Sequence, residues 1–161
     1  MRKLRTIFVK NLIKLAEKDK RIMLLNDDTG FNLFEEFEKK FPGRYINCGI
    51  IEPSYIGIAA GLALMGKKPY VYGIIPFTTM RCYEQIRNDV CYHNLDVKIV
   101  GVGGFQYYGF LGFTHNPEFD EDIKIIRILP NIKVYAPETP AEVEKAILES
   151  YHEKGPVYIR L

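Results

Sequence analysis

The feature that most constrains the fold is a regular alternation of short apolar segments with segments of helical periodicity. Residues 21–26, 69–74 and 97–102 are rich in apolar side chains and short. Such runs, bounded by turn-forming residues, are typical of buried strands. The segments between them carry apolar residues three or four positions apart, as amphipathic helices do. The alternation predicts an α/β fold with an open, mostly parallel, doubly wound sheet and helices on both faces.

The order of these elements can be predicted along the chain. Phe8, Leu12 and Leu15 indicate an amphipathic helix within residues 6–20. A capping box, Thr139-Pro140-Ala141-Glu142, starts the last helix. The other expected helices cover residues 34–41, 52–66, 80–92 and 123–129. The expected strands cover residues 21–26, 44–48, 69–74, 97–102, 132–135 and 157–161.

The composition limits the class of protein. With 161 residues and 47% hydrophobic content, the chain suits a single domain over residues 1–161, with the amphipathic helix in residues 1–20. The net charge of +2, with dispersed basic residues, gives no patch for nucleic acid or an anionic membrane. The longest strongly apolar run, residues 56–65, is too short to span a bilayer. We therefore expect a soluble, cytoplasmic protein.

The three cysteines do not predict a metal site or a disulfide framework. Cys48, Cys82 and Cys91 make an odd number and show no C-x-x-C spacing. Buried or incidental thiols are the better interpretation. The adjacent acids Asp27 and Asp28, which follow an expected strand, could bind a metal, but such acids are more often turn formers or caps.

Glu52 stands between the end of an expected strand and the start of an expected helix. Pro53 suits the first helical position, so Glu52 lies at the helix N-terminus. A carboxylate after the apolar Ile50 and Ile51 is costly to bury unless it has a partner. It could complement the helix dipole, or it could belong to a site.

The helix after Glu52 has one face with little side chain. Gly57, Ala60, Gly61 and Leu64 recur there at helical spacing. We expect something to approach this face closely, with packing against a neighbouring strand or helix as at least part of the reason.

Residues 47–52, Asn-Cys-Gly-Ile-Ile-Glu, and residues 57–63, Gly-Ile-Ala-Ala-Gly-Leu-Ala, together resemble the pyrimidine-binding domain of transketolase-type thiamine diphosphate enzymes. The resemblance covers about residues 21–161. It implies a thiamine diphosphate-binding fold of the pyrimidine type, and Glu52 matches the residue that contacts the aminopyrimidine ring. In that family the carboxyl favours the imino tautomer of the cofactor, whose exocyclic nitrogen then removes the thiazolium C2 proton.

Residues 73–81 lie where this family places aromatic side chains against the pyrimidine. Phe77 matches one of those aromatics, whereas Ile74 and Met80 stand where many relatives carry Phe and Tyr. The resemblance therefore implies cofactor binding by Glu52, Ile74, Phe77 and Met80, in a slot that still excludes water. Without the resemblance, Phe77 could equally be a core residue.

Residues 101–115 form a long loop that is rich in glycine and aromatic residues. The loop contains no G-x-G-x-x-G motif, so a nucleotide-binding interpretation is weak. Thr114-His115 matches the Thr-His of the family's active-site loop, which implies His115 as a second catalytic residue, although a loop histidine is otherwise usually just exposed. Transketolases recognise the sugar substrate with an Asp and a His at the positions where this chain has Leu111 and Gly103. The usual sugar-phosphate recognition is therefore not expected.

The sequence lacks the Gly-Asp-Gly…Asn motif with which the family holds the diphosphate through Mg²⁺. The resemblance thus implies one subunit of a split transketolase. A diphosphate-binding partner subunit would hold the Mg²⁺ in an α2β2 heterotetramer, with residues 84–90 near the subunit contact. The implied reaction is ketol transfer or carbon–carbon ligation on a small carbonyl substrate. The alternatives are a subunit of a 2-oxo acid decarboxylase or ligase of the same cofactor class, and a non-catalytic binding subunit that kept the fold.

Overall fold

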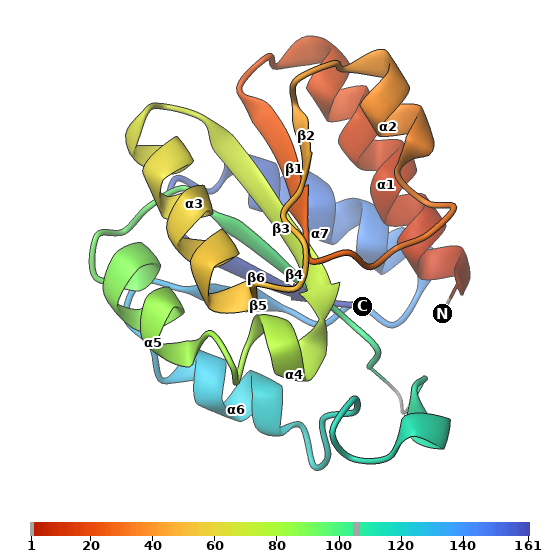
Figure 1. Ribbon diagram of the computed structural model, residues 1–161, viewed down its shortest axis with the longest axis vertical. Helices are drawn as coiled ribbons and strands as arrows, with labels where there is room; N and C mark the ends of the chain where they lie inside the picture. Colours follow the sequence, from red (N-terminus) through yellow and green to blue (C-terminus); the bar gives the residue numbers. More distant parts are fainter. Residues whose placement is uncertain (1, 105–106) are drawn as a thin grey trace.

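Six parallel strands form one open sheet in the computed structural model, which describes residues 2–104 and 107–161. The strand order is β2-β1-β3-β4-β6-β5, and the chain alternates between strands and helices as expected (Figure 1). The strands are β1 Ile22–Asn26, β2 Tyr45–Asn47, β3 Lys68–Ile74, β4 Lys98–Val102, β5 Lys133–Tyr135 and β6 Val157–Arg160. The predicted doubly wound α/β fold is confirmed.

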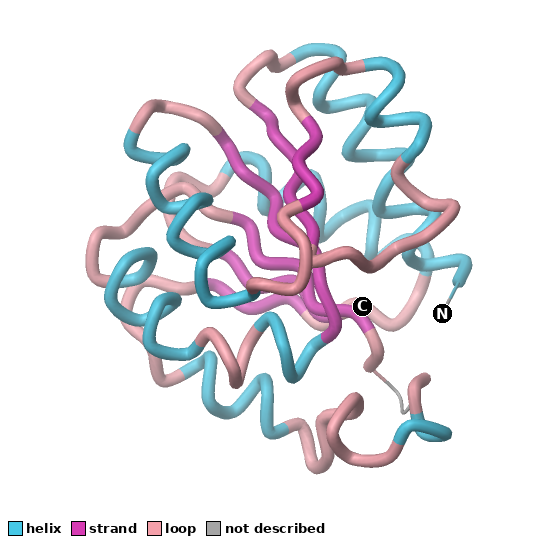
Figure 2. Tube along the Cα trace, in the orientation of Figure 1, coloured by secondary structure: helices cyan, strands magenta, loops and turns pink. Residues whose placement is uncertain are grey.

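The helices lie in two layers, one on each face of the sheet (Figure 2). One layer holds α1 Arg2–Lys18, α2 Glu35–Lys40 and α7 Pro140–His152; the other holds α3 Glu52–Leu64, α4 Ile75–Thr78, α5 Tyr83–Gln85 and α6 Glu121–Arg127. A π-helix, Ile86–Cys91, continues α5, and a 3₁₀ turn covers Gly109–Leu111.

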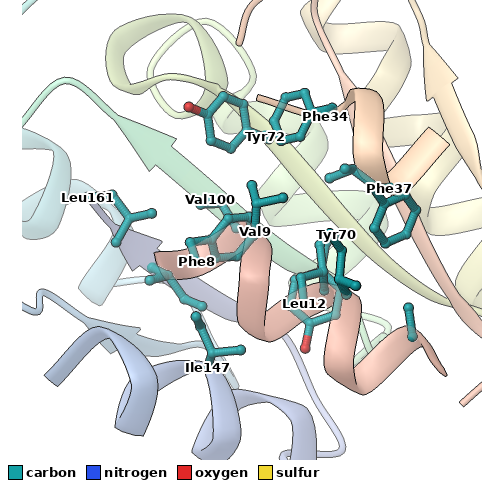
Figure 3. Packing of buried hydrophobic residues seen from close by; sticks show 14 of the residues in the cluster. Phe8, Val9, Leu12, Phe34, Phe37, Tyr70, Tyr72, Val100, Ile147 and Leu161 are labelled. Atoms are coloured by element: carbon teal, nitrogen blue, oxygen red, sulfur yellow. The ribbon is translucent and has the colours of Figure 1, made fainter. Parts of the chain in front are cut away.

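The strands supply apolar side chains to both layers because successive residues point to opposite faces. In β1, Leu24 packs into the core beneath α1, and Leu25 packs into the core beneath α3. Figure 3 shows the first core, where Phe8 and Leu12 of α1 meet Tyr70 of β3. All of these side chains are fully buried. Strands covered on both faces in this way explain the unbroken apolar runs in the sequence.

The helix boundaries agree with the sequence where capping chemistry is strong. In the predicted capping box, the Glu142 backbone N–H donates to Thr139 Oγ1 (3.3 Å) and the Thr139 N–H donates to Glu142 Oε2 (3.1 Å). At the end of α3, Gly66 has a φ of +79°, a conformation that glycine adopts without strain and that stops the helix.

The expectation of one helix over residues 80–92 is wrong in its first turn. The chain forms α4 directly after β3, with Pro76 in its first turn, and then turns before α5 begins at Tyr83. The segment continues as a π-helix, in which the Tyr92 N–H donates to the Arg87 carbonyl (3.0 Å). The wider turn directs both Val90 and Cys91 into the core.

Candidate active site

The candidate residues gather at the carboxyl edge of the sheet because all six strands run in the same direction. Asp27 directly follows β1, Ile74 ends β3, and Glu52 starts the helix that follows β2. His115 lies in the long connection after β4. In open parallel sheets this edge is where ligands bind.

Glu52 is buried at the N-terminus of α3, with only 3% of its surface exposed. Pro53 occupies the first turn of the helix, as the sequence predicts, and no side chain caps the helix start. The carboxylate has a cationic partner, because Arg81 Nη1 donates to Glu52 Oε1 at 2.8 Å. This pairing offsets part of the cost of burying the charge.

Arg81 joins Glu52 to the predicted aromatic slot. Its guanidinium carbon lies 4.2 Å from the centroid of the Phe77 ring. Phe77 in turn packs edge-on against His115, with ring centroids 4.9 Å apart. Arg81 thus joins Glu52 to Phe77, and Phe77 contacts His115. The fold brings together three residues that lie far apart in the sequence.

Sequence reasoning missed Arg81. The available signal was its spacing, since it lies four residues after Phe77 and directly after Met80. In the expected helix over residues 80–92 it would have been one more exposed cation. The turn between α4 and α5 brings it back toward Glu52 instead.

Ile74 and Met80 flank Phe77 along the chain. Ile74 is the last residue of β3, and Met80 follows α4; both are half-buried. Their assignment to cofactor binding stays a prediction from the resemblance.

His115 is half-buried, and its Nδ1 lies 2.9 Å from the Thr114 hydroxyl oxygen. The neighbouring loop is held in two places. Asn116 Oδ1 accepts from the Tyr108 backbone N–H (2.9 Å), and Arg5 of α1 donates to the Tyr107 hydroxyl (3.1 Å). Phe110 and Phe113, by contrast, are largely exposed.

Asp27 is the second residue that sequence reasoning undervalued. Asp28 behaves as a turn residue: it is exposed, has a φ of +62° and accepts from the Asn47 amide (2.8 Å). Asp27 is instead buried, with 3% of its surface exposed. Burial raises the pKa of its carboxyl to about 6. The Thr29 hydroxyl and the backbone N–H groups of Asp27 and Ile74 oppose the rise, and the charge of Glu52 adds to it.

The small-residue face of α3 is only partly covered. Ala60 is buried, but a Cβ added at Gly57 or Gly61 would meet nothing within 4 Å, and Leu64 is 71% exposed. Within the described residues no strand or helix packs closely against either glycine, so the expected close approach to this face stays a prediction.

Two general features of the described residues bear on function. Within residues 2–104 and 107–161, no cluster of three or more His, Cys, Asp or Glu side chains could hold a metal ion. No helix in the same ranges is both long and apolar enough to cross a bilayer.

The parallel sheet and the acidic and aromatic residues at its carboxyl edge define an α/β domain with a candidate ligand site at that edge. The particular family follows from sequence comparison. Residues 1–161 match the family described as "Transketolase, pyrimidine binding domain", and the chain belongs to this family. The resemblance noted in the sequence is confirmed.

Two of the relatives are named as transketolase subunits. The chain is 40% identical to an apulose-4-phosphate transketolase subunit of Actinobacillus succinogenes, over 87% of this chain and 44% of that protein. It is 37% identical to the 6-deoxy-6-sulfo-D-fructose transketolase subunit SqwH of a Clostridium species, over 98% of this chain and 49% of that protein. The chain spans about half the length of these relatives.

A solved structure supports the same relationship. It is described as a split-gene transketolase in an inactive beta4 tetramer, and it superimposes with a TM-score of 0.86 at 34% identity. The match covers 98% of this chain and 50% of that one.

Proposed function

We propose that this chain is the pyrimidine-binding part of a split, thiamine diphosphate-dependent transketolase-like enzyme. It would activate the cofactor for ketol transfer or carbon–carbon ligation on a small carbonyl substrate. The single observation that carries the proposal is the buried Glu52 carboxylate, which Arg81 joins to the Phe77 ring. Its relatives named as transketolase subunits favour this reaction class over 2-oxo acid decarboxylation and over a purely binding role.

The residues present fit the planar ring of the cofactor. The Arg81 guanidinium is itself planar and cationic, and it stacks near the Phe77 ring while it donates to Glu52 Oε1. A protonated aminopyrimidine needs the same two groups, an aromatic face and a carboxylate acceptor. Arg81 would have to withdraw from Glu52 for such a ring to take its place.

Each proposed role uses the chemistry of one side chain. Glu52 would hold a proton against the pyrimidine ring nitrogen, and Ile74, Phe77 and Met80 would fix the ring and exclude water. His115 would contact the substrate through Nε2, because Nδ1 already faces the Thr114 hydroxyl. Thiamine diphosphate, when bound, would supply the nucleophilic carbon that attacks the carbonyl.

The proposal requires a partner subunit. We assign the diphosphate and Mg²⁺ to a diphosphate-binding subunit in an α2β2 heterotetramer, located in the cytoplasm. The exposed side of α3 offers a surface for it, since Ile58 is 41% and Leu64 is 71% exposed, and Gly57 and Gly61 leave room. Glu52 starts the same helix, so a subunit that covers α3 would also close the site. The inactive beta4 tetramer of the structural relative supports the need for a partner.

The test is Glu52→Gln in the assembled complex, assayed for carbon–carbon bond formation with thiamine diphosphate and Mg²⁺. We expect kcat to fall at least about 100-fold, because the carboxyl that holds the proton is replaced by an amide. Glu144→Gln, an exposed change on α7, is the matched control and should keep full activity. Full activity of Glu52→Gln would disprove the catalytic assignment.

A further inference from the structure

We infer that Arg81 is an internal competitor of the cofactor: its guanidinium lies where the aminopyrimidine ring is proposed to bind, and the ring binds only when it displaces the arginine. Arg81 thereby sets the affinity of this chain for thiamine diphosphate without taking part in the reaction. The inference rests on the proposed function, because it concerns the slot between Glu52 and Phe77.

Arg81 contacts both groups that the cofactor ring needs. Its Nη1 donates to Glu52 Oε1 at 2.8 Å, and its guanidinium carbon lies 4.2 Å from the centroid of the Phe77 ring. A planar guanidinium at this distance interacts favourably with an aromatic face. A flat ring that used the same carboxylate and the same aromatic face would overlap the guanidinium. The ion pair and the bound ring therefore exclude each other.

The two partners of the ion pair differ in exposure. The Glu52 side chain is 4% exposed, whereas the Arg81 side chain is 45% exposed. The carboxylate thus lies inside the fold, and the guanidinium reaches it from the solvent side. When a half-exposed arginine swings outward, its charge returns to water, so breaking the pair from the arginine side costs little. Arg81 is the partner that can leave.

The turn that carries Arg81 is held independently of the arginine side chain. The Arg81 backbone N–H donates to the Pro76 carbonyl (3.0 Å). The neighbouring side chains of Thr79 and Cys82 are fully buried. The Arg81 side chain can therefore rotate out of the slot while the backbone between α4 and α5 keeps its place.

The consequence is a competition for one carboxylate. The cofactor binds only those molecules in which Arg81 has left Glu52, so the pairing equilibrium raises the apparent Kd. An ion pair with one half-exposed partner is weak enough for a cofactor held by two subunits to break it. While Arg81 is paired, it compensates the buried charge of Glu52 and covers one face of Phe77.

The first experiment measures the Kd of thiamine diphosphate by isothermal titration calorimetry, in the assembled complex with Mg²⁺. We expect Arg81→Ala to lower the Kd about 3- to 10-fold, because the competing guanidinium is removed. An arginine that only supported the slot would give the opposite sign, a higher Kd.

Arg44→Ala is the matched control. The Arg44 guanidinium carbon also lies over a phenylalanine, 4.0 Å from the centroid of the Phe41 ring. Arg44 directly precedes β2, however, and so lies at the amino edge of the sheet. Its loss should leave the Kd of thiamine diphosphate unchanged.

Glu52 must mediate the effect of Arg81. In a complex that carries Glu52→Gln, the further change Arg81→Ala should alter the Kd less than about twofold, because the guanidinium has already lost its carboxylate partner. A full gain in affinity in this background would mean that Arg81 repels the cofactor through its charge alone, and the inference would be wrong.

The outcomes separate this inference from the proposed function. If Glu52→Gln loses carbon–carbon bond formation while Arg81→Ala leaves the Kd unchanged or raises it, the function stands and the role of Arg81 is refuted. If Glu52→Gln keeps full activity, the proposed function itself fails.

The second experiment needs neither cofactor nor partner subunit. Thermal unfolding of the full chain compares Arg81→Ala in the wild-type and Glu52→Gln backgrounds. We expect the midpoint to fall by about 2–4 °C in the wild type, where a buried carboxylate loses its cation, and by less than about 1 °C in Glu52→Gln. Equal losses in both backgrounds would show that Arg81 does not pair with Glu52, and the inference would be wrong.

Discussion

Lys98 and Asp27 are both buried ionisable side chains at the ends of strands, yet their surroundings differ. Lys98 begins β4 at the amino edge of the sheet and is fully buried. Its ammonium group donates to the carbonyls of Glu153 (3.0 Å) and Gly155 (2.8 Å) and lies 2.7 Å from Asp96 Oδ1. Asp27, at the carboxyl edge, has one unpartnered oxygen and an acidic neighbour.

The difference teaches how to separate structural from functional charges in this fold. The Lys98 ammonium donates to two backbone carbonyls and forms an ion pair with Asp96, so the group ties β4 to the end of α7 and the start of β6. Within the described residues, Asp27 Oδ2 has no hydrogen-bond partner, and burial, with a smaller contribution from Glu52, destabilises the charged carboxylate. A buried charge with hydrogen-bond partners stabilises a fold, whereas a buried acid that lacks a partner for one oxygen is a candidate for function.

The largest expected effect tests the structural side of this comparison. Lys98→Met should lower the free energy of unfolding by about 3–5 kcal/mol, because two carbonyls lose their donor and Asp96 loses one of its two ion pairs, keeping the one with Lys68. Urea denaturation measures the change. Lys133→Met breaks an ion pair that is mostly exposed on the lysine side and should cost far less stability. Equal losses of unfolding free energy in the two variants would show that the buried contacts of Lys98 do not stabilise the fold more than an exposed ion pair does.

A somewhat smaller effect tests the other buried group of the comparison, Asp27. The folded-state pKa of Asp27 is about 6, above its ordinary value of 3.8, so ionising this buried group costs stability. The stability that the protonated Asp27 carboxyl contributes is fully present below pH 3.8 and is lost as the pH rises through 6. The total loss in unfolding free energy is roughly 3 kcal/mol. Asp27→Asn should therefore remove a decline in unfolding free energy between pH 4 and pH 7, as measured by urea denaturation.

Asp19→Asn is the control with the opposite sign. Hydrogen bonds from Arg21 hold the pKa of the Asp19 carboxyl far below its usual range, so the stability it adds is present above pH 3.8 and is lost only at lower pH. This variant should be less stable throughout pH 4 to 7, without a new slope. A wild-type chain whose stability is flat in this range would contradict the burial of an ionised Asp27.

The sequence predicted those parts of the site that depend on local patterns. Pro53 marks the helix start and so locates Glu52, and the alternation of elements places both Glu52 and Phe77 at one edge of the sheet. Asp27 and Arg81 could not be predicted in the same way. The burial of Asp27 depends on which strand lies beside β1 and on a glycine 46 residues away, at Gly73. The position of Arg81 depends on a turn inside a segment that looks like one helix.

The lack of a side chain at Gly73 gives the last test of the comparison. Gly73→Ala should lower the unfolding free energy by about 1–3 kcal/mol, because the new methyl group collides with Asp27 Oδ2 and Thr78 Oγ1. Gly57→Ala is the matched control: its Cβ meets nothing within 4 Å, and alanine favours the α3 helix by about 0.5–1 kcal/mol.

Thermal unfolding of the full chain distinguishes the two glycine variants, since their midpoints should move in opposite directions. The ¹³C NMR signal of the Asp27 carboxyl, followed against pH, adds a second readout, because only Gly73→Ala should shift its titration. If Gly73→Ala were as stable as the wild type and left that titration unchanged, the polar groups at this point would not be closely packed. The unpartnered oxygen of Asp27 would then have room for water, and the contrast with Lys98 would disappear.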